Sequence, residues 1–290
     1  MQDVLHLLVG GLATGAIYAL VAAGLTLQFQ MTGAVNFAQG EFVMAPAFVM
    51  LMAANLGLPV WAAILVGMAI AMLLLGVVFK VAVVGPIGRH GAVPLTLATL
   101  AIGLFLHEAL KAVFGEAARP MFTPAFAPYL DFGGISLPTE AFVVIVVVAV
   151  MLAVLVSFLG DTRTGRAMQA IAQNPVAARV VGVPVGRMLL LAFVLNSFLT
   201  GIASLLIGLP GRIGLADGVA LAVASIAAMV LGRGSLPGAI AAALLLGVLE
   251  NVAAPLVPVP YRNAIVPLVL VAAMVAGPRV PVGRTPEPAQ

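Results

Sequence analysis

The 290-residue chain contains no cysteine, which excludes disulfide bonds and thiolate metal sites. Charge is nearly as scarce, because only 8% of the residues are Asp, Glu, Lys or Arg. Soluble globular domains contain roughly a quarter of such residues. A composition so poor in charge, and 63% hydrophobic, excludes the ordinary soluble classes and indicates a membrane protein.

Motifs of catalysis and nucleotide binding are also missing. His107 and Glu108 adjoin, but the second histidine of the zinc-protease pattern H-E-x-x-H is absent. Lys111 follows three residues after Glu108, so we expect these two to form an ion pair on one helix face. No Walker A pattern occurs either. We therefore expect a chain that is not an enzyme, holds no metal or cofactor of its own, and binds no nucleic acid.

Long apolar runs are abundant. The segment AFVVIVVVAVMLAVLVSFL (141–159) contains no charge, and an uninterrupted apolar run of this length is typical of a membrane-spanning helix. We predict an all-α, polytopic bundle of about 8–10 spans in one domain, residues 1–290, with a retained first span instead of a signal peptide. The candidate spans lie near residues 5–28, 33–54, 59–84, 93–114, 140–159, 188–209, 218–232, 236–254 and 263–278.

Basic residues divide unequally between the two sides of this bundle. Cytoplasmic loops retain Lys and Arg, so the richer side predicts the cytoplasmic face. We therefore expect the N-terminus outside and the C-terminus inside. The richer side has Lys80, Arg89, Arg163, Arg166, Arg179, Arg187, Arg233, Arg279 and Arg284, and the poorer side has Lys111, Arg119, Arg212 and Arg262.

An external loop is predicted at 115–139. Its prolines, Pro120, Pro124, Pro128 and Pro138, disfavour regular structure. The loop suits either a docking surface for an external partner or an ordinary connection, and the sequence favours neither.

Small residues recur every four positions in two spans, which lets helix backbones approach closely in lipid. We interpret both rows as packing faces. They consist of Gly11, Gly15, Ala19 and Ala23 in the first span, and Ala220, Ala224, Ala228 and Gly232 in the seventh.

The loop at 161–187 is rich in arginine and contains TRTGRAMQAIAQNPVAARVVGV (162–183). Thr164 can cap a first helix that begins near Gly165. Asn174 can cap a second helix with Pro175 at its first position, and Gly182 can end it in a left-handed conformation. Two short helices of this kind suit either the surface of the cytoplasmic leaflet or a groove on a soluble partner.

Four stretches, in order along the chain, carry a family resemblance. They are GAIYALVAAGLTLQFQMTGAVNFAQGEF (15–42), PLTLATLAIGLFLHE (94–108), GRAMQAIAQNPVAARVVGV (165–183) and LGRGSLPGAIAAALLLGVLENV (231–252). Together they resemble the permease family of branched-chain amino acid ABC importers, over roughly residues 5–280.

The resemblance implies a bacterial inner-membrane permease that moves substrate inward by alternating access. It implies a second permease subunit, identical or homologous, two cytoplasmic subunits that bind ATP, and an external solute-binding protein. By the same resemblance, the loop 161–187 couples the ATPases to the spans. The implied coupling residues are Arg163, Gly165, Arg166, Ala170, Asn174, Ala178 and Gly182.

Polar groups inside spans are costly in lipid and usually face a cavity, so they are candidates for the substrate path. The densest cluster is NFAQGEF (36–42), in which Asn36 and Gln39 could instead form a helix capping box, the interpretation we prefer for Asn36. The path candidates are Gln39, Glu41, Asn36, Tyr18, Thr96, Thr99 and Asn196.

Two alternatives to a branched-chain amino acid importer remain open. One is a stand-alone, ion-coupled secondary transporter or channel, for which Glu41 and Glu250 are the available intramembrane carboxylates. The other is the same type of importer with urea, short amides or another small organic solute as its substrate.

Overall fold

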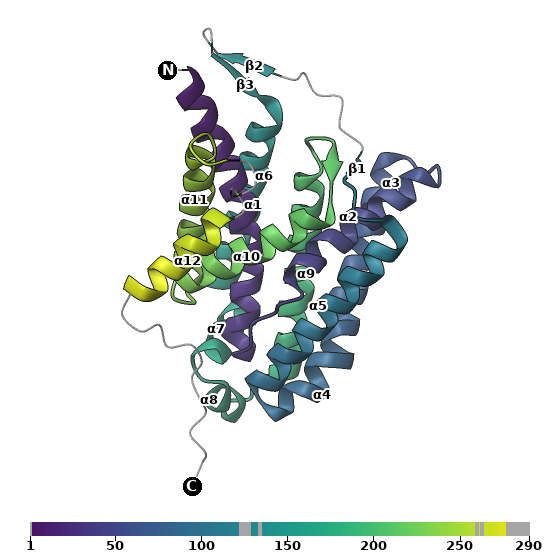
Figure 1. The fold of residues 1–290 in the computed structure, drawn as a ribbon. Helices are drawn as coiled ribbons and strands as arrows, with labels where there is room; N and C mark the ends of the chain where they lie inside the picture. The colour runs from purple at the N-terminus through teal and green to yellow at the C-terminus, as the bar shows by residue number, and fades with distance from the viewer. Residues whose placement is uncertain (1, 122–128, 133–134, 259–260, 262–263, 277–290) are drawn as a thin grey trace.

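A computed structural model of the chain describes residues 2–121, 129–132, 135–258, 261 and 264–276 (Figure 1). Helices make up nearly all of it, with four short strands. The helices are α1 (Gln2–Thr32), α2 (Gln39–Asn55), α3 (Val60–Ile70), α4 (Gly85–Ile87), α5 (Ala92–Phe114), α6 (Thr139–Asp161), α7 (Arg163–Gln173), α8 (Pro175–Val180), α9 (Val185–Ile207), α10 (Leu215–Leu231), α11 (Leu236–Ala253) and α12 (Ile265–Ala276). Two π-helical segments, η1 (Ala71–Val78) and η2 (Lys80–Val84), and a 3₁₀ turn, η3 (Gly88–His90), continue α3 toward α5.

Among the described residues, six helical segments are long and apolar enough to cross a membrane, which confirms the all-α polytopic class. They are Leu5–Thr32, Val60–His90, Ala92–Phe114, Thr139–Asp161, Val185–Ile207 and Leu236–Ala253. The shorter helices α2, α10 and α12 lie where three further spans were predicted. The link 33–38 between α1 and α2 is not helical, so the second helix begins later than the sequence pattern suggested.

Helix α1 lies at the centre of the bundle and packs against α6, α9, α10 and α11 (Figure 1). Its closest approach is to α11. A Cβ added at Gly11 would lie 2.8 Å from the Val248 Cα, and one at Gly15 would lie 2.8 Å from the Leu244 carbonyl oxygen. The first row of small residues is therefore a packing face, as predicted.

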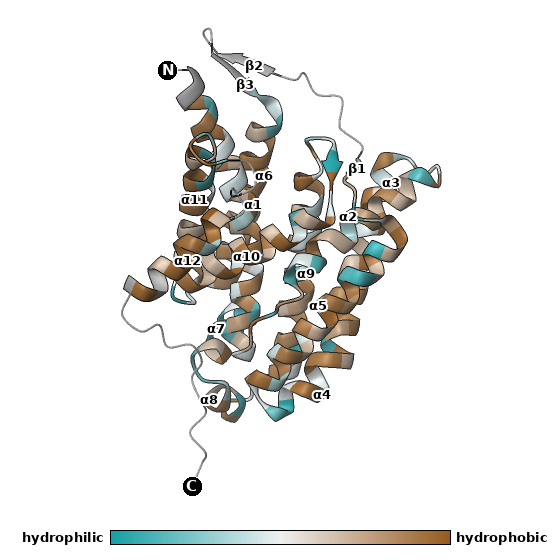
Figure 2. Cartoon of the chain, viewed as in Figure 1, coloured by the Kyte–Doolittle hydropathy of each residue, from teal (hydrophilic) through white to brown (hydrophobic). Residues whose placement is uncertain are grey.

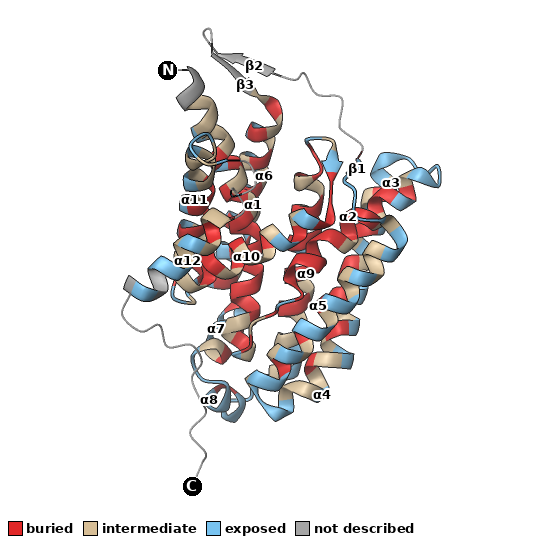
Figure 3. Cartoon of the chain, in the orientation of Figure 1, coloured by how far each residue is buried: buried red, intermediate tan, exposed pale blue. Residues whose placement is uncertain are grey.

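Burial decreases from the centre outward. Most of α2, the middle of α1 and the second half of α9 are buried, whereas α5 and α6 present exposed apolar side chains such as Phe105 and Val154 (Figures 2 and 3). An apolar outer face is what a helix in contact with lipid tails requires.

The loop 115–139 contains more regular structure than its prolines suggested. Strand β1 (Arg119–Pro120) pairs with β4 (Arg212–Ile213), and β2 (Tyr129–Phe132) pairs with β3 (Ile135–Pro138), both antiparallel. Proline is tolerated in edge strands and at strand ends, and these ladders have only two strands each. Pro124 and Pro128 lie outside the described residues.

One end of the molecule is rich in arginine. Helices α4, α7 and α8 lie at one end, and the β2–β3 hairpin and the start of α1 lie at the other (Figure 1). The first end includes Arg89 and the arginines of loop 161–187. Arg233 is at this end too, because Gln30 near the end of α1 donates to the Gly234 carbonyl. Arg262, Arg279 and Arg284 lie outside the described residues.

Candidate functional site

The link between α1 and α2 is held by polar side chains. Gly33, at φ 70°, ends α1 in a conformation that favours glycine. The Asn36 side chain donates to the Gln28 side chain (3.1 Å) and accepts from the Ala38 backbone N–H (3.1 Å). The Thr99 hydroxyl accepts from the Phe37 backbone N–H at 3.1 Å. Asn36 and Thr99 therefore fix the entry to α2.

The capping box predicted for Asn36 and Gln39 is wrong. Helix α2 begins at Gln39 with Ala38 at the N-cap and no side-chain cap. Gln39 instead pairs with Asn196 of α9: the Gln39 amide donates at 2.9 Å and accepts from the Asn196 amide at 3.2 Å. Both side chains are fully buried. The reciprocal pair thus satisfies hydrogen-bonding groups of two buried amides, one on α2 and one on α9.

Glu41, which is buried, and His107, which is half-buried, form a second polar contact, between α2 and α5. The Nδ1 atom of His107 lies 2.9 Å from a carboxylate oxygen of Glu41, whose other oxygen has no partner among the described residues. The predicted Glu108–Lys111 pair is wrong, because Lys111 pairs with Glu116 beyond the end of α5. The hydrogen bond and charge of Lys111 lower the pKa of the exposed Glu116 carboxyl below its ordinary value.

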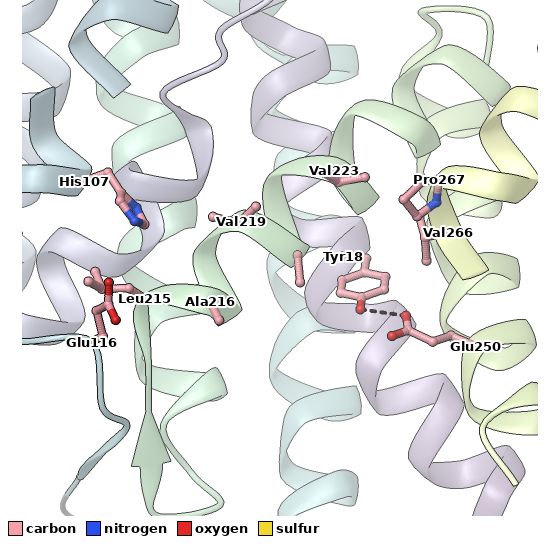
Figure 4. A pocket seen from close by; sticks show the side chains of 11 residues that line it. Tyr18, His107, Glu116, Leu215, Ala216, Val219, Val223, Glu250, Val266 and Pro267 are labelled. Atoms are coloured by element: carbon pink, nitrogen blue, oxygen red, sulfur yellow. Dashed lines mark hydrogen bonds between the residues drawn. The ribbon is translucent and has the colours of Figure 1, made fainter. Parts of the chain in front are cut away.

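A pocket of about 480 Å³ lies between α1, α5, α10, α11 and α12 (Figure 4). His107 and Glu116 lie near the start of α10 (Figure 4). On the other side of α10, the Tyr18 hydroxyl donates to the Glu250 carboxylate at 2.7 Å. The apolar lining consists of Leu215, Ala216, Val219, Ala220 and Val223 of α10, with Val266 and Pro267 of α12.

The predicted path residues divide into three groups. Asn36, Gln39, Thr99 and Asn196 belong to the buried contacts beside α2. Tyr18 lines the pocket. Glu41 is not among the lining residues but contacts His107, which is. Thr96 is half-buried, and its carbonyl accepts from the Thr99 hydroxyl. The structure adds His107, for which the available signal was an ionisable side chain inside an apolar helix, and it brings Glu250, predicted only as an ion-coupling carboxylate, to the same pocket.

Loop 161–187 folds as two short capped helices. The N-cap of α7 is Thr162, whose hydroxyl accepts from the Gly165 N–H at 2.9 Å, so the cap lies two residues before the predicted Thr164. At α8, the predicted cap is confirmed, because the Asn174 side chain accepts from the N–H groups of Val176 and Ala177, both at 3.0 Å. Gly182 adopts a left-handed φ of 84° after α8.

One face of this loop holds it to the bundle. Met168 and Ile171 are buried, and Gln169 donates to the Leu159 carbonyl of α6 at 3.0 Å. Gly165 packs against the backbone of Phe158 and Leu159, and Ala178 is also buried. These two predicted coupling residues are therefore placed to position the loop.

The opposite face is exposed. It includes Arg163, Arg166, Asn174, Arg179 and Gly182 of the predicted coupling set, with Ala170 half-buried. Val176, Val180 and Val181 are also exposed, at 69%, 83% and 77% of their surface. The exposed residues of α7 and α8 thus include both arginines and apolar side chains.

A multi-pass helical bundle with a pocket between its helices, polar at one end and apolar along its wall, suits a membrane permease. The family model described as the branched-chain amino acid transport system permease component matches residues 7–275, and the chain belongs to this family.

Relatives match over most of their length. The permease protein BraD of a high-affinity branched-chain amino acid transport system in Pseudomonas aeruginosa is 28% identical, covering 91% of this chain and 92% of its own. LivH of Escherichia coli strain K12 is 25% identical over 94% of both chains, and a probable LivH of Methanocaldococcus jannaschii is 28% identical over 84% and 79%. A chain of the solved structure of PsaBC from Streptococcus pneumoniae in complex with Fab has a TM-score of 0.49 and 17% identity over 94% and 93%.

Proposed function

We propose that this chain is the membrane-spanning subunit of a binding-protein-dependent ABC importer that carries branched-chain amino acids into the cell. Its partners are two cytoplasmic ATP-binding subunits, a second permease subunit and an external solute-binding protein. The N-terminus lies outside and the α7–α8 end lies in the cytoplasm. The chain performs no chemistry itself. The family match and the substrate named for BraD and LivH support this proposal.

The observation that carries the proposal is the exposed face of α7 and α8. Surface arginines beside exposed valines suit a groove on a soluble protein that is apolar at its base and acidic at its rim. Of the ion pairs among the described residues, His107–Glu41 and Lys111–Glu116, neither uses an arginine of this loop. The arginines are thus available to a partner.

The attachment of α7 suits the transmission of force. The Cβ position of Gly165 is filled by the α6 backbone, and Met168 and Ile171 pack into the bundle. A displacement of α7 by a partner would therefore move α6 and α9 with it. ATP binding drives this displacement only if the ATPase dimer binds one arrangement of the loop more tightly than the other.

Co-purification tests the docking role. The tagged chain is extracted from native membranes in mild detergent, as the parent and as the double variant Arg166→Glu/Arg179→Glu. We expect a Walker A ATPase with the parent and its loss, by about tenfold or more, with the variant. Arg89→Glu is the matched control, since Arg89 is a basic residue at the same end but outside the loop.

A chain that purifies alone and is unaffected by the double variant would contradict the proposal. That result would favour the stand-alone transporter, with α7 and α8 lying on lipid. Glu41→Gln would then be the next variant to assay for ion-coupled uptake.

A further inference from the structure

The pocket between α1, α10, α11 and α12 has a polar end and an apolar wall, and together they define the chemistry of a ligand. We infer that Glu250 binds the ammonium group of the transported solute, while Val219, Val223 and Val266 contact its apolar side chain. This inference rests on the proposed function and deepens it, because it assigns the solute's recognition to named residues of the permease.

The charge of the lining selects a cation. Two carboxylates line the pocket, Glu250 and Glu116, together with His107, which is paired with Glu41, and none of the lining residues is Lys or Arg. Glu116 is already paired with Lys111 outside the pocket. Glu250 has no such partner among the described ion pairs, and it accepts a hydrogen bond from the neutral Tyr18 hydroxyl. A carboxylate within an apolar helix bundle is costly without a positive partner, and a solute ammonium would provide one.

The hydrogen bond from Tyr18 leaves acceptor positions of the Glu250 carboxylate open to a solute ammonium group. An ionised carboxylate accepts at about four lone-pair positions, and the Tyr18 hydroxyl occupies one of them. Tyr18 is itself buried on the central helix, so its hydroxyl holds the Glu250 carboxylate in a fixed orientation. Glu250 is thus oriented by the fold and still able to accept from an ammonium group.

The apolar wall selects the rest of the solute. Val219 and Val223 lie one turn apart on α10 and point from that helix into the pocket, with Val266 of α12 near Tyr18 (Figure 4). A branched aliphatic side chain suits this wall, and the volume of about 480 Å³ lies within the range of small-molecule sites. Urea and short amides lack the positive charge, and urea also lacks an aliphatic group, so this pocket does not suit them.

Binding to the purified permease complex, without its binding protein, tests the assignment. Thermal stabilisation of the complex is measured with three probes: isopentylamine, which has the cation and the aliphatic group, 4-methylpentanoate, which has an anion instead, and urea. We expect stabilisation by isopentylamine alone, because a ligand of the folded state raises its stability. Glu250→Gln should weaken this binding by about tenfold or more, since it removes a charge-assisted hydrogen bond.

Two controls separate binding from structure. Glu250→Gln keeps an oxygen that can accept from Tyr18, so we expect the unfolding temperature without ligand to stay close to the parent's. Glu108→Gln makes the same chemical change at an exposed position of α5 and should leave isopentylamine binding unchanged. Glu250→Asp, which keeps the charge, should recover part of the binding.

Equal binding of isopentylamine by the parent and Glu250→Gln would overturn the assignment, as would stabilisation by 4-methylpentanoate alone. A lower unfolding temperature of Glu250→Gln with unchanged isopentylamine binding would also overturn it, and would assign Glu250 a structural role. These results are independent of uptake. A chain that binds isopentylamine through Glu250 but transports no branched-chain amino acid would refute the proposed substrate and retain the site.

Discussion

At the level of single residues, substitution of Gln39 or Asn196 should lower the free energy of unfolding, because each leaves a buried amide without its partner. Each amide donates to and accepts from the other, and neither side chain is exposed. If one amide is replaced by an apolar group, the other retains a donor and an acceptor in a dry environment. Such a loss typically costs about 1–3 kcal/mol, whereas replacing both partners is nearly neutral.

We therefore predict that Gln39→Met and Asn196→Leu each lower the free energy of unfolding by about 1–3 kcal/mol, and that the double variant loses less than the sum. Thermal or denaturant unfolding in detergent gives the three values. Additive losses would mean that the two amides do not depend on each other, contrary to the reciprocal pair.

Among the helices, the α1–α11 contact depends on glycine at defined positions. The Cβ position of Gly11 lies 2.8 Å from the backbone of Val248, whereas that of Gly10 has only an ordinary contact at 3.5 Å. Adjacent residues of one helix thus face very different space. A methyl group added at Gly10 is tolerated, whereas one added at Gly11 forces the backbones of α1 and α11 apart.

Gly11→Ala should destabilise the chain by about 1–3 kcal/mol, because α11 must shift to admit the methyl group. Gly10→Ala is the matched control, and it should be neutral or slightly stabilising since alanine favours the helix. Unfolding of both variants is compared with the parent. A similar result for the two would contradict the close packing of α1 on α11.

The cap of α8 gives a further prediction. Asn174 accepts from two N–H groups at the start of this six-residue helix, so Asn174→Ala should disorder α8 locally at a cost of about 1 kcal/mol. We expect reduced ATPase co-purification with little change in the unfolding temperature of the bundle. Asn174→Asp keeps the cap and should retain the ATPase; equal losses in both variants would show that the cap is irrelevant to docking.

How much of the fold can be predicted from sequence depends on the range of the interaction. The apolar runs, the Asn174–Pro175 cap and the left-handed Gly182 are local features, and each follows from a few neighbouring residues. The amide pair joins residues 157 positions apart, and the Tyr18–Glu250 bond joins residues 232 apart. Local patterns therefore suggested a capping box at Asn36 and an ion pair at Glu108, whereas Gln39 pairs with Asn196 where α2 packs on α9, and Lys111 pairs with Glu116 just beyond the end of α5.

Across the whole molecule, the arginines of α7 and α8 lie at the end opposite the β2–β3 hairpin (Figure 1). Such asymmetry is typical of a chain whose basic end lies in the cytoplasm. The absence of cysteine makes this orientation directly testable, because each introduced thiol is unique.

We predict that a membrane-impermeant maleimide labels Leu56→Cys, in the turn between α2 and α3, on intact cells. Val180→Cys, on α8, should react only after the membrane is permeabilised. Both positions are well exposed, at 73% and 83%, so accessibility alone does not separate them. The reverse pattern of labelling would invert the proposed topology.

The central claim is that this permease moves branched-chain amino acids inward when partner ATPases hydrolyse ATP. The most direct test is leucine uptake into proteoliposomes that contain the purified complex and its binding protein, with ATP supplied on the side of α7 and α8. The account predicts uptake that requires ATP and is lost in Arg166→Glu/Arg179→Glu. Uptake by this chain alone, driven by a proton or sodium gradient without ATP, would contradict it.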